Sequence, residues 1–240
     1  MSDGPLLSVV IPVFNERDAL PVTLARVAAA PFDKEIIVVD DGSTDGTRDY
    51  LDALQQGREK VAGLAPDRLA ITFHAKNCGK GGALRTAFAA ARGRFVIIQD
   101  ADLEYDPSDY THMLEPLTSG RADVVYGTRL AGGGAHRVLF FWHSLGNRLL
   151  TILSNMLTDL NLTDMETGYK AFRRELLDRL VIKSNRFGVE PELTARFSRM
   201  KCRIYEVPIS YYGRTYAEGK KIGWRDAIAA FFHIIRFRFF

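Results

Sequence analysis

The chain has 240 residues, of which 47% are hydrophobic and 25% are charged. This composition is that of an ordinary globular protein, and the length suits one large domain or one domain with an appendage. The formal net charge of +3 is small, which argues against a general nucleic-acid-binding protein, and no nucleic acid is expected as a partner. Basic residues nevertheless outnumber acidic ones from Lys201 onward, by eight to three.

The two cysteines and the apolar segments indicate the cellular compartment in which the protein is found. Cys78 and Cys202 form neither a metal-spaced cluster nor a disulfide framework, which indicates a reducing compartment. The first residues lack the basic and apolar regions of a signal peptide. No uninterrupted apolar run reaches the roughly 20 residues that span a bilayer. The nearest, residues 138–157, contains His143, Asn147, Arg148 and Asn155.

The first half of the chain alternates between strand and helix patterns. Apolar runs predict strands at residues 7–13, 35–41, 69–73, 94–99 and 122–126. Helices are predicted between them, ending near residues 30, 56 and 92, and a further helix is expected to begin at Pro107. Interleaved strands and helices imply an α/β fold with a mostly parallel central sheet.

The second half is less regular. Residues 138–157 predict one or two amphipathic helices, and residues 176–180 and 192–200 predict further helices. A strand is expected at residues 202–209, a final helix at 224–240, and a mobile loop at Gly132-Gly133-Gly134. No internal repeat or low-complexity linker is present, so the second half is expected to complete one domain. We therefore divide the chain into a domain at 1–222 and an amphipathic C-terminal helix at 223–240.

Polar clusters follow the predicted strands. Ligands of such sheets bind at the carboxyl ends of the strands, so these clusters are expected to lie together. They are Asn15-Glu16, Asp40-Asp41, residues 77–80, residues 100–104 and residues 127–129.

The most informative cluster is Asp100-Ala101-Asp102, at the end of the fourth predicted strand. Side chains alternate along a strand, so the two aspartates can point the same way, and Glu104 follows at the same period. Carboxylates this close repel one another unless a cation lies between them. Hard oxygen ligands suit Mg²⁺ or Mn²⁺, which often join carboxylates to a substrate's phosphates. The pattern predicts a metal–diphosphate site, and an acidic solvated corner is the alternative.

Other residues suit a nucleotide. Lys80 lies in the glycine-rich turn of residues 79–82 at a helix start, where backbone amides and the helix dipole favour an anion, although the spacing is not that of a P-loop. Asp40 or Asp41 can accept hydrogen bonds from a base or a ribose, or can simply cap a turn. Cys78 is expected to be structural. Several basic side chains could meet phosphate or remain surface charges: Lys80, Arg129, Arg148, Arg214, Lys220 and Lys221.

These motifs, in this order, resemble glycosyltransferase family 2, a family of inverting enzymes with a GT-A nucleotide-sugar-binding fold. The four matching segments of the first half are residues 10–16, 38–45, 77–83 and 100–107. The second half is similar to the dolichol-phosphate mannose synthase branch. The matching residues there are 127–129, 164–170, Arg214 and 219–224.

The resemblance assigns roles to individual residues. The nucleoside would be held by Pro12, Val13, Asn15, Glu16 and either Asp40 or Asp41. Asp100 and Asp102, with Ala101 between them, would bind the metal and the diphosphate, and Glu104 is a third candidate ligand where that branch often has Gln. The phosphates of donor and acceptor would be neutralised by Arg129, Arg148, Arg214 and Lys220.

The implied reaction transfers a hexose from a GDP-mannose or UDP-glucose type of donor to a polyprenyl or dolichyl phosphate. The acceptor phosphate is already anionic, because its second pKa is about 6, so a strong general base is unnecessary. An alternative is a transferase of the same fold that acts on a sugar hydroxyl in cell-surface polysaccharide synthesis. That reaction would need a carboxylate base, for which the candidates are Asp164, Glu166, Glu190 and Glu192. A non-catalytic nucleotide-binding or membrane-adaptor protein is the third possibility, and the intact Asp100-Ala101-Asp102 argues against it.

The last predicted helix suggests contact with a membrane surface. Its apolar residues recur near helical spacing: Trp224, Ile228, Phe231, Phe232, Ile235 and Phe239. Arg225, Arg236 and Arg238 are placed to reach lipid phosphates. The helix that begins near residue 138 could add a second apolar surface. We expect a cytoplasmic protein, peripheral at the inner face of the membrane. The alternative is that both helices pack on the core or in a homo-oligomer, and a membrane protein as partner is also left open.

Overall fold

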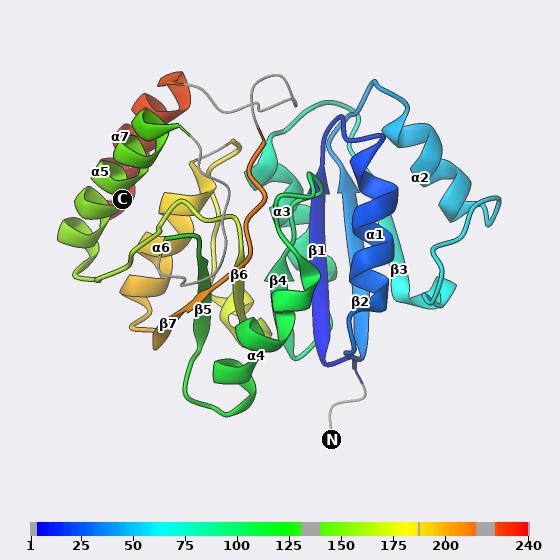
Figure 1. Cartoon of the computed structure of the whole chain (residues 1–240), viewed down its shortest axis with the longest axis horizontal. Coiled ribbons are helices and arrows are strands. Elements are labelled where there is room, and N and C mark those ends of the chain that lie inside the picture. Colours follow the sequence, from blue (N-terminus) through cyan, green and yellow to red (C-terminus); the bar gives the residue numbers. More distant parts are fainter. Residues whose placement is uncertain (1–3, 131–139, 187, 215–223, 240) are drawn as a thin grey trace.

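The computed structural model describes residues 4–130, 140–186, 188–214 and 224–239. Within these residues the chain forms one seven-stranded sheet in the order β3-β2-β1-β4-β6-β5-β7 (Figure 1). The strands are β1 (Leu7–Val13), β2 (Lys34–Asp40), β3 (Leu69–Phe73), β4 (Phe95–Ile98), β5 (Val124–Thr128), β6 (Lys170–Arg173) and β7 (Ile204–Pro208).

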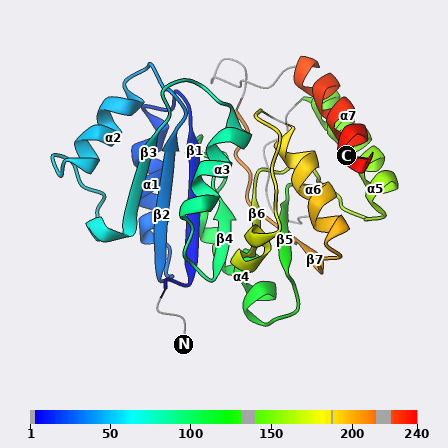
Figure 2. The same ribbon diagram turned by 180° about the vertical axis from the view of Figure 1, so that it is seen from behind.

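Helices cover both faces of the sheet (Figures 1 and 2). α1, α2 and α4 pack on one face, where alternate residues of β1 such as Val9 and Ile11 point, and α3 and α6 pack on the other, with Val10. The α-helices are α1 (Ala19–Ala29), α2 (Thr47–Gln55), α3 (Lys80–Ala90), α4 (Tyr110–Thr118), α5 (Phe141–Thr158), α6 (Val189–Arg199) and α7 (Trp224–Phe239). Short 3-10 helices span Pro66–Arg68, Pro107–Asp109 and Arg174–Asp178.

The strand pairing is mostly parallel, as the sequence predicted. β1 pairs in parallel with β2 and β4, β2 with β3, and β5 with β7. β6 is antiparallel to both of its neighbours, β4 and β5. This strand was not predicted, because it has only four residues and is bounded by Lys170 and Arg173, so it lacks a readable apolar run. Its place in the sheet is nevertheless fully buried at Lys170, Ala171 and Phe172.

The prediction of one or two helices at residues 138–157 is confirmed by the single helix α5. One other element differs from the prediction. Residues 176–180 were expected to be a helix, and this region is the 3-10 turn Arg174–Asp178.

Helices α5 and α7 lie side by side at one end of the molecule, and α7 also packs against α6 (Figures 1 and 2). None of the described helices is both long enough and apolar enough to cross a bilayer. The predicted domain boundary after residue 222, the glycine run 132–134, Lys220 and Lys221 all lie outside the described residues. The division of the chain at residue 222 therefore stays a prediction.

A buried carboxylate fastens the amino-terminal ends of the central strands. Glu35, 2% exposed, accepts hydrogen bonds from Ser8 Oγ at 2.6 Å, from the Arg92 amide at 2.7 Å and from the Gly93 amide at 3.2 Å. Arg92 Nε also donates to Glu35, at 2.9 Å. Burial alone would raise the pKa of Glu35, but the hydrogen bonds from Ser8 and Arg92 outweigh it and leave the pKa below its usual value.

We predict that Glu35→Gln lowers the free energy of unfolding by about 1–3 kcal/mol, because buried amides lose a charged acceptor. The folded-state pKa lies below the unfolded value, so the contribution of the carboxylate is present above about pH 4.3 and is lost as pH falls through the folded pKa. Urea denaturation of both proteins should therefore give a difference that shrinks in acid. Glu115→Gln, in an exposed pair with Arg121, is the control and should change little. Equal effects of the two variants would contradict the prediction.

Candidate active site

A cavity of about 1130 Å³ opens where the parallel strands end. Its wall includes residues from the ends of β1, β2 and β4, from the start of α3, and from α5 and α7. Most of the residues predicted from sequence lie on it: Pro12, Val13, Glu16, Asp41, Lys80, Asp100, Ala101, Asp102, Glu104, Arg129 and Arg214. The topology thus collects residues that are up to about 200 positions apart in the chain.

Three predicted residues do not line the cavity. Asn15, at a positive φ of 53°, joins the loop after β1 to the loop after β2, since its amide donates to Ser43 and its Oδ1 accepts from the Thr44 amide. Asp40 is fully buried beneath Arg48, with 3.8 Å between the carboxylate and the guanidinium. Arg148 is exposed on α5. Lys220 lies outside the described residues.

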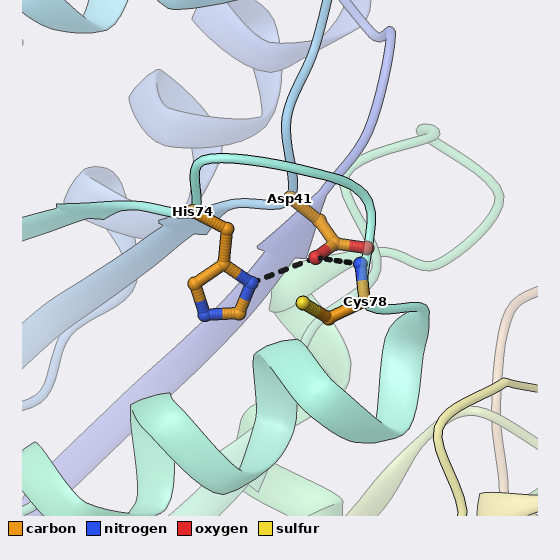
Figure 3. A group of neighbouring side chains, drawn as sticks. All are labelled: Asp41, His74 and Cys78. Carbon is orange, nitrogen blue, oxygen red and sulfur yellow. Dashed lines mark hydrogen bonds and ion pairs between the residues drawn. The ribbon is translucent and has the colours of Figure 1, made fainter.

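Asp41 holds the start of α3 in place (Figure 3). Its Oδ1 accepts from the Cys78 amide at 2.8 Å, and its Oδ2 accepts from the Gly79 amide at 2.7 Å. His74 Nδ1 lies 2.7 Å from Oδ1, and His74 Nε2 lies 2.9 Å from Thr86 Oγ1. The oxygen, nitrogen and sulfur ligand atoms of Asp41, His74 and Cys78 lie within 4.8 Å of one another. Both carboxylate oxygens already accept backbone amides, so this cluster acts as a clamp on the glycine-rich turn.

The first acidic residue of the predicted metal motif is held by a lysine. Lys80 Nζ lies 2.7 Å from Asp100 Oδ1 and 2.9 Å from Glu190 Oε1. Burial would lower the pKa of Lys80, but the charges of Asp100 and Glu190 raise it well above its usual value, so the ammonium is retained. A Cβ at Gly168, just before β6, would lie 2.3 Å from Asp100 Oδ2, which is why that position has no side chain.

The second acidic residue is held by an arginine. Arg214 Nη2 lies 3.2 Å from Asp102 Oδ2 and 3.3 Å from Glu16 Oε1. The backbone amide of Arg214 donates to Glu104 Oε1 at 2.9 Å, and Tyr211 Oη donates to Glu104 Oε2 at 2.9 Å. Both oxygens of Glu104 therefore accept from the segment that carries Arg214.

The acidic motif carries more negative charge than its neighbours neutralise. Burial, followed by the charges of Asp100 and Glu104, raises the pKa of Asp102 to about 7, although Arg214 opposes the shift. Hard carboxylate oxygens with uncompensated charge suit a divalent cation such as Mg²⁺ or Mn²⁺. Asp100 and Asp102 thus fit a metal ion, with Lys80 and Arg214 as the cations now beside them.

Another residue of the wall, Arg129, forms a buried ion pair. Arg129 Nε and Nη2 lie 2.6 and 2.7 Å from the two oxygens of Asp164, and Asn147 Nδ2 donates to Asp164 at 2.9 Å. Burial would raise the pKa of Asp164, but Arg129 outweighs it and lowers the pKa. Glu192, fully buried, accepts from the amides of Lys183 and Ser184. Of the four candidate bases, only Glu166 and Glu190 line the cavity.

No role was predicted from sequence for two aromatic residues of the cavity wall, Tyr105 and Tyr211. Tyr105 Oη accepts from the Gly168 amide at 2.9 Å, and its ring stacks on Tyr169 with 4.9 Å between centroids. Arg129 lies over the ring of Tyr211, 5.1 Å from its centroid. Tyr105 was visible beside Glu104 in the acidic motif, but no spacing rule connects it to Gly168 or Tyr211.

We predict that Arg214→Ala tightens the binding of Mn²⁺ several-fold in the absence of nucleotide. The reason is that the guanidinium competes with the ion for Asp102 and Glu16. Calorimetric titration with MnCl₂ measures the effect, and Arg121→Ala, in an exposed and remote pair, is the control. Unchanged or weaker affinity in Arg214→Ala would mean that Arg214 does not compete for this site.

Comparison with known proteins places this geometry in a family. The family model described as glycosyl transferase family 2 matches residues 8–181. An undecaprenyl-phosphate mannosyltransferase of Micrococcus luteus is 32% identical over 226 residues, which cover 89% of this chain and 86% of that protein. A polyprenol monophosphomannose synthase of Mycolicibacterium smegmatis is 31% identical over 221 residues, which cover 90% and 80%.

Solved structures show the same fold. The glucosyl-3-phosphoglycerate synthase of Mycobacterium tuberculosis, in complex with Mn²⁺, UDP and glucosyl-3-phosphoglycerate, superposes with a TM-score of 0.71 at 22% identity, covering 98% of this chain and 80% of that one. The complex of the same enzyme with Mg²⁺ and UDP gives a TM-score of 0.70 at 23% identity, covering 98% and 79%. The fold is therefore of the GT-A type, as the sequence predicted, and the chain belongs to glycosyl transferase family 2.

Proposed function

We propose that the protein transfers a hexose from a nucleotide diphosphate-sugar to a polyprenyl phosphate, with inversion at the anomeric carbon and dependence on Mg²⁺ or Mn²⁺. The observation that carries this proposal is the pair Asp100 and Asp102 on a cavity whose wall also includes apolar residues of α5 and α7. The names of the two curated relatives refer to polyprenyl acceptors and to mannose, which supports this acceptor class.

The donor would extend across the ends of β1, β2 and β4. Its nucleoside would lie at Pro12, Val13 and Asp41, and Asp100 and Asp102 would hold the metal with the diphosphate. When bound, such an ion supplies a positive charge that polarises phosphoryl oxygens. Lys80 and Arg214, already beside these aspartates, would stabilise the negative charge that develops on the departing diphosphate.

The acceptor phosphate would lie near Arg129 and Arg214. Both arginines are close to Tyr211, since Arg129 covers its ring and Arg214 shares Glu104 with its hydroxyl. A phosphate monoester is a nucleophile without prior loss of a proton at neutral pH, because its second pKa is about 6. Asp164 is occupied by Arg129, so the site offers this arginine as a fixed cation and does not need a base there.

A second candidate is transfer to a sugar hydroxyl, for which a carboxylate base is needed. The observation in its favour is that Glu166 and Glu190 both line the cavity, and each has a buried oxygen without a hydrogen-bond partner among the described residues. The acceptor screen below separates the two reactions.

The docking surface of the protein would be the outer side of α5 and α7. Phe141 is 69% exposed and Phe232 64%, and both helices also contribute to the cavity wall. Clusters of exposed aromatic residues mark interaction surfaces, and Arg236 and Arg238, both exposed, could reach lipid phosphates. The side chain of Arg225 lies outside the described part. Docking at the cytoplasmic face of a membrane would leave the acceptor's tail in the lipid while its phosphate reaches Arg129 and Arg214.

Metal-dependent donor binding and lipid-linked transfer should be observed together. GDP-mannose and UDP-glucose are offered with and without polyprenyl phosphate, in Mn²⁺, Mg²⁺ or EDTA. We expect a radiolabelled lipid product with one donor, dependent on the ion, and at least a tenfold loss of donor affinity in Asp102→Asn, since a metal ligand is removed. Glu115→Gln is the control. Equal donor affinity in EDTA and in Asp102→Asn would refute the metal role, and transfer to a sugar hydroxyl alone would favour the second candidate.

Membrane docking is tested by co-sedimentation with anionic vesicles at low salt. We expect the native chain to sediment and the variant Phe141→Glu/Phe232→Glu to stay in solution, because charged side chains oppose insertion at the interface. Val22→Glu, at an exposed position of α1, is the matched control and should sediment like the native chain. If all three proteins stay in solution, or all three sediment alike, this face does not bind lipid.

A further inference from the structure

Two carboxylates in the cavity have oxygens that the described residues leave unsatisfied. Glu166 Oε1 and Glu190 Oε2 are buried and have no hydrogen-bond partner within that part of the chain. An unsatisfied buried acceptor destabilises the fold, so such atoms are rare in native proteins. Both residues belong to the cavity wall, so a ligand group can supply the missing partners.

The neighbouring cations are already engaged. Lys80 binds Glu190 through its other oxygen, Oε1, at 2.9 Å. Lys170 Nζ donates to the carbonyl oxygens of Met165 and Thr167, and Arg129 is held by Asp164. Glu166 therefore lines the cavity without an ion-pair partner among the described residues.

The environment favours a neutral carboxyl at Glu166. Burial, followed by the charge of Glu190, raises the pKa of Glu166 to about 8, while Lys170 and Arg129 oppose the shift. A neutral carboxyl offers one donor and one acceptor, and an alcohol hydroxyl also offers both. A phosphate at this place would be repelled by the charge of Glu190, and a hydrocarbon tail would leave both oxygens unpaired. Hydroxyl groups are thus the chemistry that fits.

The order of chemical groups along the donor indicates that these hydroxyl groups belong to its hexose. In a nucleotide diphosphate-sugar the hexose follows the diphosphate, and Lys80 joins Asp100 directly to Glu190. Glu190 thus lies next to the proposed diphosphate site, and Glu166, on the same cavity wall, is close enough to Glu190 for the charge of Glu190 to raise its pKa.

We propose that Glu166 is a specificity-determining residue that hydrogen-bonds a hydroxyl of the donor's hexose, with Glu190 beside it. This inference rests on the proposed donor class. The inference assigns to Glu166 the recognition of the sugar and not of the nucleotide.

The test compares each nucleotide with its sugar conjugate. Affinities for GDP and GDP-mannose, and for UDP and UDP-glucose, are measured by calorimetry in Mn²⁺ with the native chain, Glu166→Gln and Glu166→Leu. For Glu166→Leu we expect about a tenfold loss for the sugar nucleotide and no change for the nucleotide alone. Glu166→Gln keeps a donor and an acceptor without charge and should retain most of the affinity.

Monodeoxy analogues of the bound donor complete the test. One analogue should lose affinity with the native chain and with Glu166→Gln, and lose nothing further with Glu166→Leu, because the two changes remove the same hydrogen bond. Normal nucleotide binding shows that each variant is folded. If the ratio of the affinity for the sugar nucleotide to the affinity for the nucleotide alone is the same in all three proteins, Glu166 does not recognise the sugar. If the native chain binds neither nucleotide, the proposed function itself fails, and the inference falls with it.

Discussion

The electrostatic constraint on which this site depends is the crowding of carboxylates at one edge of the sheet. Asp100, Asp102 and Glu104 follow a single strand, and Glu16 and Glu190 approach from other elements. Such groups can remain ionised together only if cations lie between them. Lys80 and Arg214 supply that charge, each between two carboxylates of different elements. These bridges tie the glycine-rich turn, the acidic motif and the segment after β7 into one cavity.

The direction of the antiparallel strand β6 places the residues that precede it at the cavity. Because β6 runs against β4 and β5, its start lies at the edge where β4 ends. The preceding residues therefore pass beside the acidic motif, so closely that a Cβ at Gly168 would collide with Asp100. The same passage brings Glu166 to the wall and Asp164 to Arg129, which also lines the cavity. A purely parallel sheet would have returned this segment to the opposite edge.

The outer helices connect this chemistry to the surface. α5 and α7 pack on each other and on α6, and residues such as Trp142 and Ala230 reach the cavity from them. Their outer sides carry exposed aromatic residues. The same two helices therefore form one wall of the polar site and an apolar surface, an arrangement that suits a substrate with a charged head and a hydrocarbon tail.

Local periodicity and short motifs such as Asp100-Ala101-Asp102 were enough to predict the alternating architecture and the polar clusters at the strand ends. They did not reveal β6, since a four-residue strand with charged ends has no readable period. The pairing of each carboxylate with a particular cationic side chain depends on the tertiary fold. Asp40 is covered by Arg48, Asp164 is held by Arg129, and Glu166 is left without an ion-pair partner among the described residues. These pairings join residues distant in the chain, and their charge states follow from burial, which no local pattern encodes.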